Sequence, residues 1–123
     1  MSRNKILIVD DELNVCSFLS DFLDYKGFES TITQSGMGAL KKLKFEDFDL
    51  VLLDLMMPEM SGFEVFEKIN QMDNKVPVII LTGVRDQNVA NDLIEMGAVD
   101  FISKPIDLDR LEQSIIMNIK YLK

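Results

Sequence analysis

Apolar residues are grouped in short runs along the chain, and these runs alternate with segments of helical periodicity. Three runs are apolar on both faces, over Lys5–Val9, 49–53 and 76–81. Runs of this kind are typical of parallel strands that are covered by helices on both sides. The segment Glu29–Thr33 is more polar and alternating, which indicates an edge strand, and residues 99–102 predict a short fifth strand.

Five segments that follow these runs repeat apolar residues at the three- and four-residue spacing of an amphipathic helix. The first begins at Leu13 and ends at Gly27, because glycine readily adopts the left-handed conformation of a carboxyl-terminal cap. Gly97 is suited to end the helix at 86–96 in the same way. The other predicted helices cover residues 37–45, 62–72 and 108–122.

A strand and a helix therefore alternate five times, and this order predicts a fold class. Alternation of this kind implies a parallel sheet with right-handed crossover connections. We expect an α/β, flavodoxin-like, doubly wound sheet of five parallel strands in the order 2-1-3-4-5, with five helices. A length of 123 residues without a linker or low-complexity tract indicates a single domain, 1–123.

Charge and missing residue types narrow the chemistry. A net charge of −8 repels phosphodiester backbones and anionic lipids, so we expect no direct contact with nucleic acid or membrane. The absence of histidine excludes histidine-based acid–base catalysis and histidine-ligated metal sites. The single cysteine, Cys16, cannot form an internal disulfide, and no apolar run is long enough to span a bilayer, so we expect a cytoplasmic location.

Polar side chains stand at the carboxyl ends of four predicted strands. These ends meet at one edge of a parallel sheet, and in this strand order a crevice lies where strands 1 and 3 are neighbours. Three carboxylates and a lysine are therefore expected to converge there. They are Asp10 and Asp11 after strand 1, Asp54 after strand 3 and Lys104 after strand 5, with Thr82 and Gly83 at the end of strand 4.

Three carboxylates at one edge need a counter-charge. Two unit charges about 5 Å apart repel by roughly 3 kcal/mol at an effective dielectric constant near 20. A divalent cation and the ammonium group of Lys104 can offset this repulsion. Oxygen ligands with several retained waters suit Mg²⁺, or Mn²⁺ in its place.

Four segments, in this order and spacing, resemble the response-regulator receiver domains of bacterial two-component systems, and the chemotaxis regulators among them. They are ILIVDDE at 6–12, DLVLLDLMMPEMSG at 49–62, ILTG at 80–83 and SKP at 103–105. The resemblance implies a signalling phosphoprotein and not a metabolic enzyme. Asp54 would accept a phosphoryl group from a sensor histidine kinase or a histidine phosphotransfer protein, and the domain would assist its own phosphorylation and dephosphorylation.

The same resemblance implies the metal ligands. Asp11, Asp54 and the backbone carbonyl of Met56 would bind Mg²⁺, and Asp10 would do so directly or through a water molecule. Lys104 would pair with a phosphoryl oxygen. No bound organic cofactor is implied.

The resemblance also implies a switch. The hydroxyl of Thr82 would be drawn to the phosphoryl group, for which Gly83 leaves room, and Phe101 would swing inward. Pro105 would follow a cis peptide bond. The face formed by helix 4, strand 5 and helix 5 would then change shape and contact an effector or output domain, or a second phosphorylated copy in a homodimer.

Two other functions stay open on the residues alone. A Mg²⁺-dependent phosphohydrolase with an aspartyl-phosphate intermediate usually carries a second aspartate two residues after its nucleophile, where this chain has Met56. A flavin carrier would need a Thr/Ser/Gly-rich phosphate loop after strand 1, where residues 10–12 are acidic. Residues 10–12 could also simply cap the helix that follows.

Two expectations concern apolar side chains away from the edge. A last helix that continues to residue 122 would place Met117 and Tyr121 four residues apart on an exposed stripe that could contact a partner. The aromatic side chains near helix ends are expected in the core. They are Phe45, Phe48, Phe63 and Phe66.

Overall fold

Strands and helices alternate five times in the computed structural model, which describes residues 3–73, 75–119 and 121–123. The strands are β1 (Lys5–Val9), β2 (Glu29–Thr33), β3 (Leu50–Asp54), β4 (Val78–Thr82) and β5 (Asp100–Ser103). The helices are α1 (Leu13–Tyr25), α2 (Gly36–Phe45), α3 (Gly62–Asn70), α4 (Gln87–Glu95) and α5 (Leu108–Asn118). Within these described residues, no helix combines the length and the apolar character that crossing a membrane requires.

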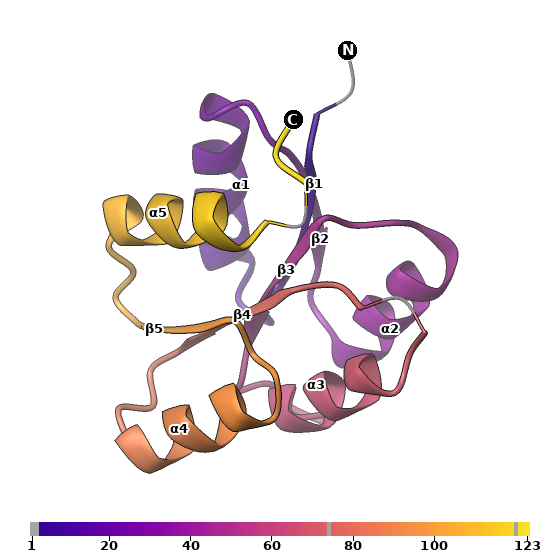
Figure 1. Cartoon of the computed structure of the whole chain (residues 1–123), viewed down its shortest axis with the longest axis vertical. Helices are drawn as coiled ribbons and strands as arrows, with labels where there is room; N and C mark the ends of the chain where they lie inside the picture. The colour runs from indigo at the N-terminus through magenta and orange to yellow at the C-terminus, as the bar shows by residue number, and fades with distance from the viewer. Residues whose placement is uncertain (1–2, 74, 120) are drawn as a thin grey trace.

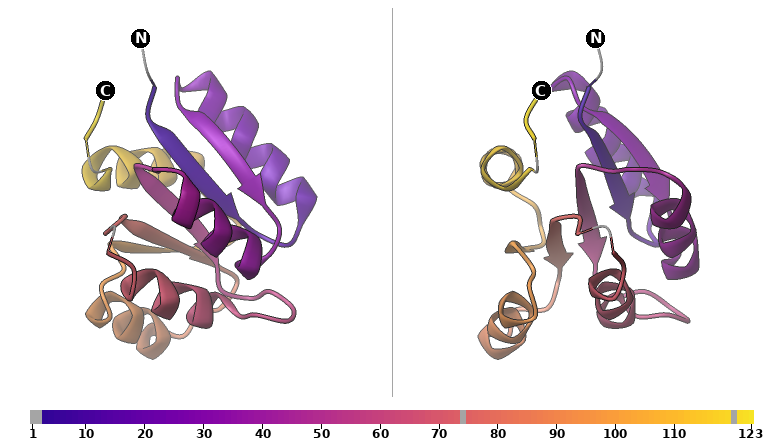
Figure 2. Two further views of the ribbon diagram at one scale, coloured as in Figure 1. Left: turned by 90° about the vertical axis from the view of Figure 1, so that its right-hand side faces the viewer. Right: turned by 45° about the vertical axis from the view of Figure 1, so that its right-hand side comes forward.

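The five strands form one parallel sheet in the order β2-β1-β3-β4-β5, which confirms the predicted fold. Helices α1 and α5 cover one face, and α2, α3 and α4 cover the other (Figures 1 and 2). The register pairs Asp54 with Leu81 and Thr82 with Ser103. The carboxyl ends of β3, β4 and β5 are therefore level with one another.

Two apolar layers hold the helices to the sheet, because successive strand residues point to opposite faces. In β1, Ile6 and Ile8 pack toward α1 and α5, whereas Leu7 and Val9 pack toward α2, α3 and α4. Every residue of β3 and β4 is buried, as the continuous apolar runs predict for central strands.

The last helix is shorter than predicted, so Met117 and Tyr121 do not form a row on one helix, but both side chains are exposed as expected, at 83% and 70%. Helix α5 ends at Asn118, and Ile119 is already extended, with ψ at 140°. The buried side chain of Asn4 holds Tyr121 and Lys123: its amide donates to the Tyr121 carbonyl at 2.6 Å, and its oxygen accepts from the Lys123 N–H at 2.8 Å. These bonds compete with a further helical turn.

Only two of the four expected aromatic core residues are buried. Phe48 and Phe66 lie in the core, but Phe45 is 72% exposed and Phe63 is 40% exposed. Phe45 stands two positions after the buried Leu43, which turns it to the outer side of α2.

Gly62 allows α3 to start directly against the end of β3. Its N–H donates to the Leu55 carbonyl at 2.9 Å, and the Ser61 hydroxyl caps the helix by accepting from the Glu64 N–H at 3.3 Å. A β-carbon at Gly62 would collide with the Asp54 carbonyl and would lie 2.5 Å from the Leu55 α-carbon. The backbone that carries Asp54 therefore depends on a residue without a side chain.

We expect Gly62→Ala to lower the free energy of unfolding by about 2 kcal/mol, because the obstructing atoms are backbone and cannot turn aside. Urea unfolding measures the change. Gly83→Ala is the matched control, since its β-carbon would meet no atom within 4 Å, and it should change stability by less than about 0.5 kcal/mol. Equal losses in the two variants would contradict this account.

Candidate functional site

The side chains that the sequence assigned to one edge do converge there. Asp10 directly follows β1, Asp54 ends β3 and Thr82 ends β4, and all three are buried. Lys104 directly follows β5, and its backbone N–H donates to the Thr82 carbonyl at 2.7 Å. Four strands thus each bring one polar residue to a common edge.

The ammonium group of Lys104 lies between two buried carboxylates. Its Nζ atom is 2.8 Å from Oδ2 of Asp10 and 3.5 Å from Oδ1 of Asp54. Burial acts to lower the pKa of Lys104, but the hydrogen bond to Asp10 and the charges of Asp54 and Asp10 outweigh burial and raise it. Lys104 therefore stays charged and offsets part of the repulsion between the carboxylates.

Among Asp10, Asp54 and Lys104, it is Asp54 whose charged form the surroundings destabilise. Burial and the nearby charge of Asp10 raise the pKa of Asp54 to about 6, against the opposing effects of Lys104 and a backbone hydrogen bond at Met56. Without a bound cation, Asp54 is thus largely ionised at neutral pH, at a cost to the stability of the fold. A positive charge brought close to Asp54 would relieve this cost.

Three neighbouring carboxylates offer oxygen ligands beside Asp54. Oxygens of Asp10, Asp11 and Glu12 lie within 4.8 Å of one another. Glu12 was not predicted as a ligand; its position directly after Asp11 is the only sequence signal for it. Asp54 stands outside this trio. The donor set consists of oxygen atoms alone, which fits a hard cation such as Mg²⁺.

The acidic trio does not act as a helix cap. Glu12 is the N-cap residue of α1, yet its side chain makes no capping hydrogen bond. Asp10 accepts the Glu12 N–H at 3.0 Å through Oδ1, which orients the loop and leaves Oδ2 to Lys104. The capping explanation of residues 10–12 is therefore not supported.

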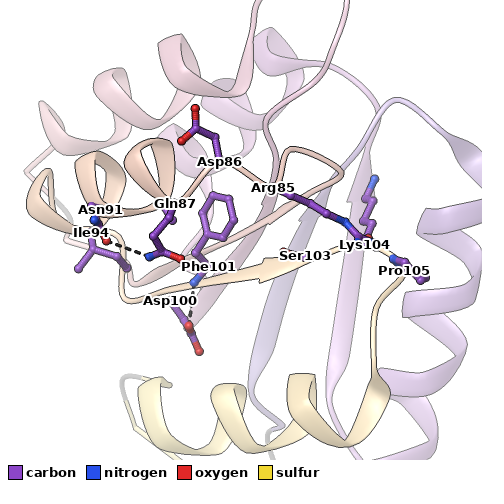
Figure 3. Close-up of a pocket in the computed structure, with 11 residues that line it drawn as sticks. Arg85, Asp86, Gln87, Asn91, Ile94, Asp100, Phe101, Ser103, Lys104 and Pro105 are labelled. Carbon is purple, nitrogen blue, oxygen red and sulfur yellow. Dashed lines mark hydrogen bonds between the residues drawn. The ribbon is translucent and has the colours of Figure 1, made fainter.

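Two of the predicted switch residues, Phe101 and Pro105, line a hollow next to this edge, whereas Thr82 is buried at the end of β4. Thr82 accepts the Val84 N–H at 3.1 Å through Oγ1, which leaves its own hydroxyl proton for another acceptor. Phe101 is half-buried and lines a hollow of about 650 Å³ between α4 and β5, where its ring points toward Asp86 and Gln87 (Figure 3). The peptide bond between Lys104 and Pro105 is cis.

Space is available where the sequence predicted it. A β-carbon at Gly83 would meet nothing within 4 Å, so the segment after Thr82 borders open space.

The single cysteine, Cys16, is fully buried and donates to the Asp10 carbonyl at 3.2 Å, and burial raises the pKa of its thiol to about 11. Cys16 is thus a packed, unreactive thiol beneath the site.

Comparison with known proteins assigns the chain to a family. Residues 6–116 match the family described as the response regulator receiver domain. The chain is 34% identical over 110 residues to the transcriptional regulatory protein ZraR of Klebsiella oxytoca, which covers 89% of this chain and 25% of that protein. It is 38% identical over 108 residues to the regulatory protein AtoC of Escherichia coli, which covers 88% of this chain and 23% of that protein. The chain thus spans about a quarter of the length of these relatives.

Solved structures agree with this assignment. The signal receiver domain of a protein described as a Luxo repressor, from Vibrio parahaemolyticus, superposes with a TM-score of 0.92 at 32% identity and covers 97% of this chain and 92% of that chain. A CheY-like receiver domain from Methanospirillum hungatei superposes with a TM-score of 0.88 at 29% identity, over 94% of this chain and 93% of that chain. Fold, motifs and relatives agree, and the chain belongs to the response-regulator receiver family, whose members are signalling proteins and not classical enzymes.

Proposed function

We propose that residues 1–123 form a single receiver domain that accepts a phosphoryl group on Asp54 from a sensor histidine kinase or a histidine phosphotransfer protein. One observation carries this proposal: a buried carboxylate with a raised pKa lies beside a lysine ammonium group and an acidic trio of oxygen ligands. That arrangement suits a nucleophile that is ionised at neutral pH and whose negative charge is stabilised further when a cation comes close to it.

Transfer from phosphohistidine uses Asp54 as an ionised nucleophile. An Asp54 oxygen forms the new bond to phosphorus, the bond from phosphorus to the donor imidazole breaks, and the imidazole leaves with the electron pair. Because Asp54 is largely ionised at neutral pH, the step needs no general base. Lys104 would turn from Asp10 toward the phosphoryl oxygens, whose charge it neutralises.

A Mg²⁺ ion fits the oxygens around Asp54. Asp10, Asp11 and Asp54, with the backbone carbonyl of Met56, would hold it, and the carboxylate of Glu12 lies within 4.8 Å of those of Asp10 and Asp11. When bound, the ion supplies positive charge beside the transferred phosphoryl group. The nearness of Asp10, Asp11 and Glu12 to one another supports this assignment.

The phosphoryl group would act on the distant face through Thr82 and Phe101. Its oxygens would accept the free hydroxyl proton of Thr82, and the ring of Phe101 would move inward from the hollow between α4 and β5. The surface of α4, β5 and α5 would change for an output domain or a second phosphorylated copy. The regulatory names of the relatives support such an output.

A phosphohydrolase on the same site is disfavoured. Such an enzyme needs an acid two residues after the nucleophile to protonate a leaving group, and the side chain there is the exposed thioether of Met56. A thioether cannot donate a proton.

The phosphosite prediction is that acetyl phosphate with Mg²⁺ labels Asp54 alone. Intact-mass and peptide mass spectrometry should find one added phosphoryl group in the wild type and none in Asp54→Asn. Asp49→Asn is a control at the other end of β3, since Asp49 accepts the Lys5 N–H, and it should keep the label. A label that persists in Asp54→Asn would contradict the assignment of Asp54 as the phosphorylated residue.

The pH prediction follows from the raised pKa of Asp54. The folded state binds the Asp54 proton more tightly than the unfolded state does, so the Asp54 charge destabilises the fold progressively as the pH rises from about 4, and the penalty is complete above about pH 6. A shift from 3.8 to about 6 corresponds to up to about 3 kcal/mol. In EDTA at pH 7, Asp54→Asn should therefore be more stable than the wild type by up to this amount.

Urea unfolding of both proteins between pH 4 and pH 8 checks the pH prediction. The advantage of Asp54→Asn should shrink as the pH falls through about 6, and millimolar Mg²⁺ at pH 7 should also shrink it by stabilising the wild type more. A difference that is constant with pH, or that ignores Mg²⁺, would count against strain at Asp54.

The switch prediction concerns Thr82. Thr82→Ala should still accept the phosphoryl group from acetyl phosphate but should lose most of the accompanying chemical-shift change at Phe101 and along β5. Thr82→Ser keeps the hydroxyl and is the matched control. An unaltered response at Phe101 in phosphorylated Thr82→Ala would refute coupling through this hydroxyl.

A further inference from the structure

Helix α2 has the opposite charge to the rest of the chain. It contains Lys41, Lys42 and Lys44, three of the 13 basic residues, and no acidic residue. With a net charge of −8 for the whole chain and +3 for α2, the remainder carries −11. A basic helix on an acidic domain presents a local field that attracts negative charge.

The outer side of this helix also exposes large apolar side chains. Ala39 and Leu43 pack into the core, whereas Met37 and Phe45 are 66% and 72% exposed. Positions 37, 41 and 45 are four residues apart and therefore form one row on the helix, with position 44 beside it. We call Met37, Lys41, Lys44 and Phe45 the α2 stripe; the helix lies on the face of the sheet that it shares with α3 (Figure 2).

The two lysines of the α2 stripe are not used by the fold. Among the described residues, Lys42 forms an ion pair with Glu46 at 3.5 Å. None of the ion pairs among these residues includes Lys41 or Lys44. Lys44 instead places Nζ 5.6 Å from the centre of the Phe45 ring. An exposed cation and an aromatic ring are thus held together where neither stabilises the core.

Hollows flank the α2 stripe on both sides. One, of about 440 Å³, is lined by Met37, Leu40, Lys41, Lys44 and Phe45, with Gly38. The other, of about 320 Å³, lies between α2 and the edge strand β2, where Ile32 forms part of its wall. Phe45 and Lys41 border both hollows, so an apolar side chain can enter beside Phe45 while its neighbours reach the lysines.

We propose that the α2 stripe docks an acidic segment of a partner protein, which seats an apolar side chain beside Phe45 and sets carboxylates on Lys41 and Lys44. Exposure to solvent alone would explain the three lysines of α2. It does not explain the two large exposed apolar side chains or the hollows beside them. An anionic membrane is the weaker occupant, because such binding usually takes four or more basic residues, whereas α2 carries three.

A titration followed by ¹⁵N–¹H NMR tests the docking site. The probe is a short synthetic peptide rich in glutamate with phenylalanine between the charges, and its control has lysine in place of each glutamate. The acidic peptide should shift the amide signals of α2 and of Ile32, and the basic peptide should not. Raising the salt from about 0.05 M to about 0.5 M should weaken binding on the order of tenfold.

Matched variants separate the α2 stripe from overall charge. Lys41→Glu with Lys44→Glu should weaken binding at least tenfold, and Phe45→Ala should weaken it several-fold. Lys68→Glu with Lys75→Glu changes the net charge equally at exposed positions on α3 and the α3–β4 loop, and it should leave binding within about twofold. All these variants should keep phosphorylation on Asp54, since α2 contributes no residue to that site.

Shifts spread over the whole surface, equal binding of the basic peptide, or equal losses in the two double variants would overturn the proposal. So would binding of phosphatidylglycerol vesicles that depends on Lys41 and Lys44 while the acidic peptide fails to bind. Failure of these peptide tests leaves the phosphosite untouched, and failure of the Asp54 label leaves the α2 stripe untouched.

Discussion

Two buried carboxylates, Asp10 and Asp54, share the single ammonium group of Lys104, and the properties of the site follow from this shortage of positive charge. Lys104 lies closer to Asp10 than to Asp54, so Asp54 is the less compensated of the two. Its pKa rises to about 6 and its ionised form destabilises the fold. A cation brought close to Asp54 would change that balance and stabilise the folded state.

The sheet supplies the rigidity that this unfavourable arrangement needs. Asp54 and Thr82 end fully buried central strands, and Lys104 is tied to the end of β4 through its backbone N–H. Gly62 lets α3 begin in direct contact with the backbone at Asp54. Repelling groups can remain close only because the apolar layers on both faces of the sheet hold their backbone attachments in place.

Charge is also unevenly divided over the rest of the surface. The acidic trio gathers at the carboxyl edge of the sheet, whereas the lysines of α2 gather on an outer helix that carries exposed Met37 and Phe45. The chain therefore presents one region suited to cations and phosphoryl groups and another suited to acidic protein. These regions lie on different elements, so a partner at α2 need not compete with a ligand at the carboxyl edge of the sheet.

The sequence alone determined which segments are strands and helices, because two-sided apolar runs and amphipathic spacing are local patterns. Their fivefold alternation then predicted the strand order and the residues at the carboxyl edge of the sheet. The sequence did not determine where α5 ends, since Asn4, more than a hundred positions away, captures Tyr121 and Lys123. Nor did it separate exposed Phe45 from buried Phe66, which depends on how each helix is rotated against the sheet.

Three properties of the site are likewise tertiary. They are the pairing of Lys104 with Asp10, the place of Glu12 beside Asp11 and the raised pKa of Asp54. Each arises from distances and burial that exist only once distant strands are side by side.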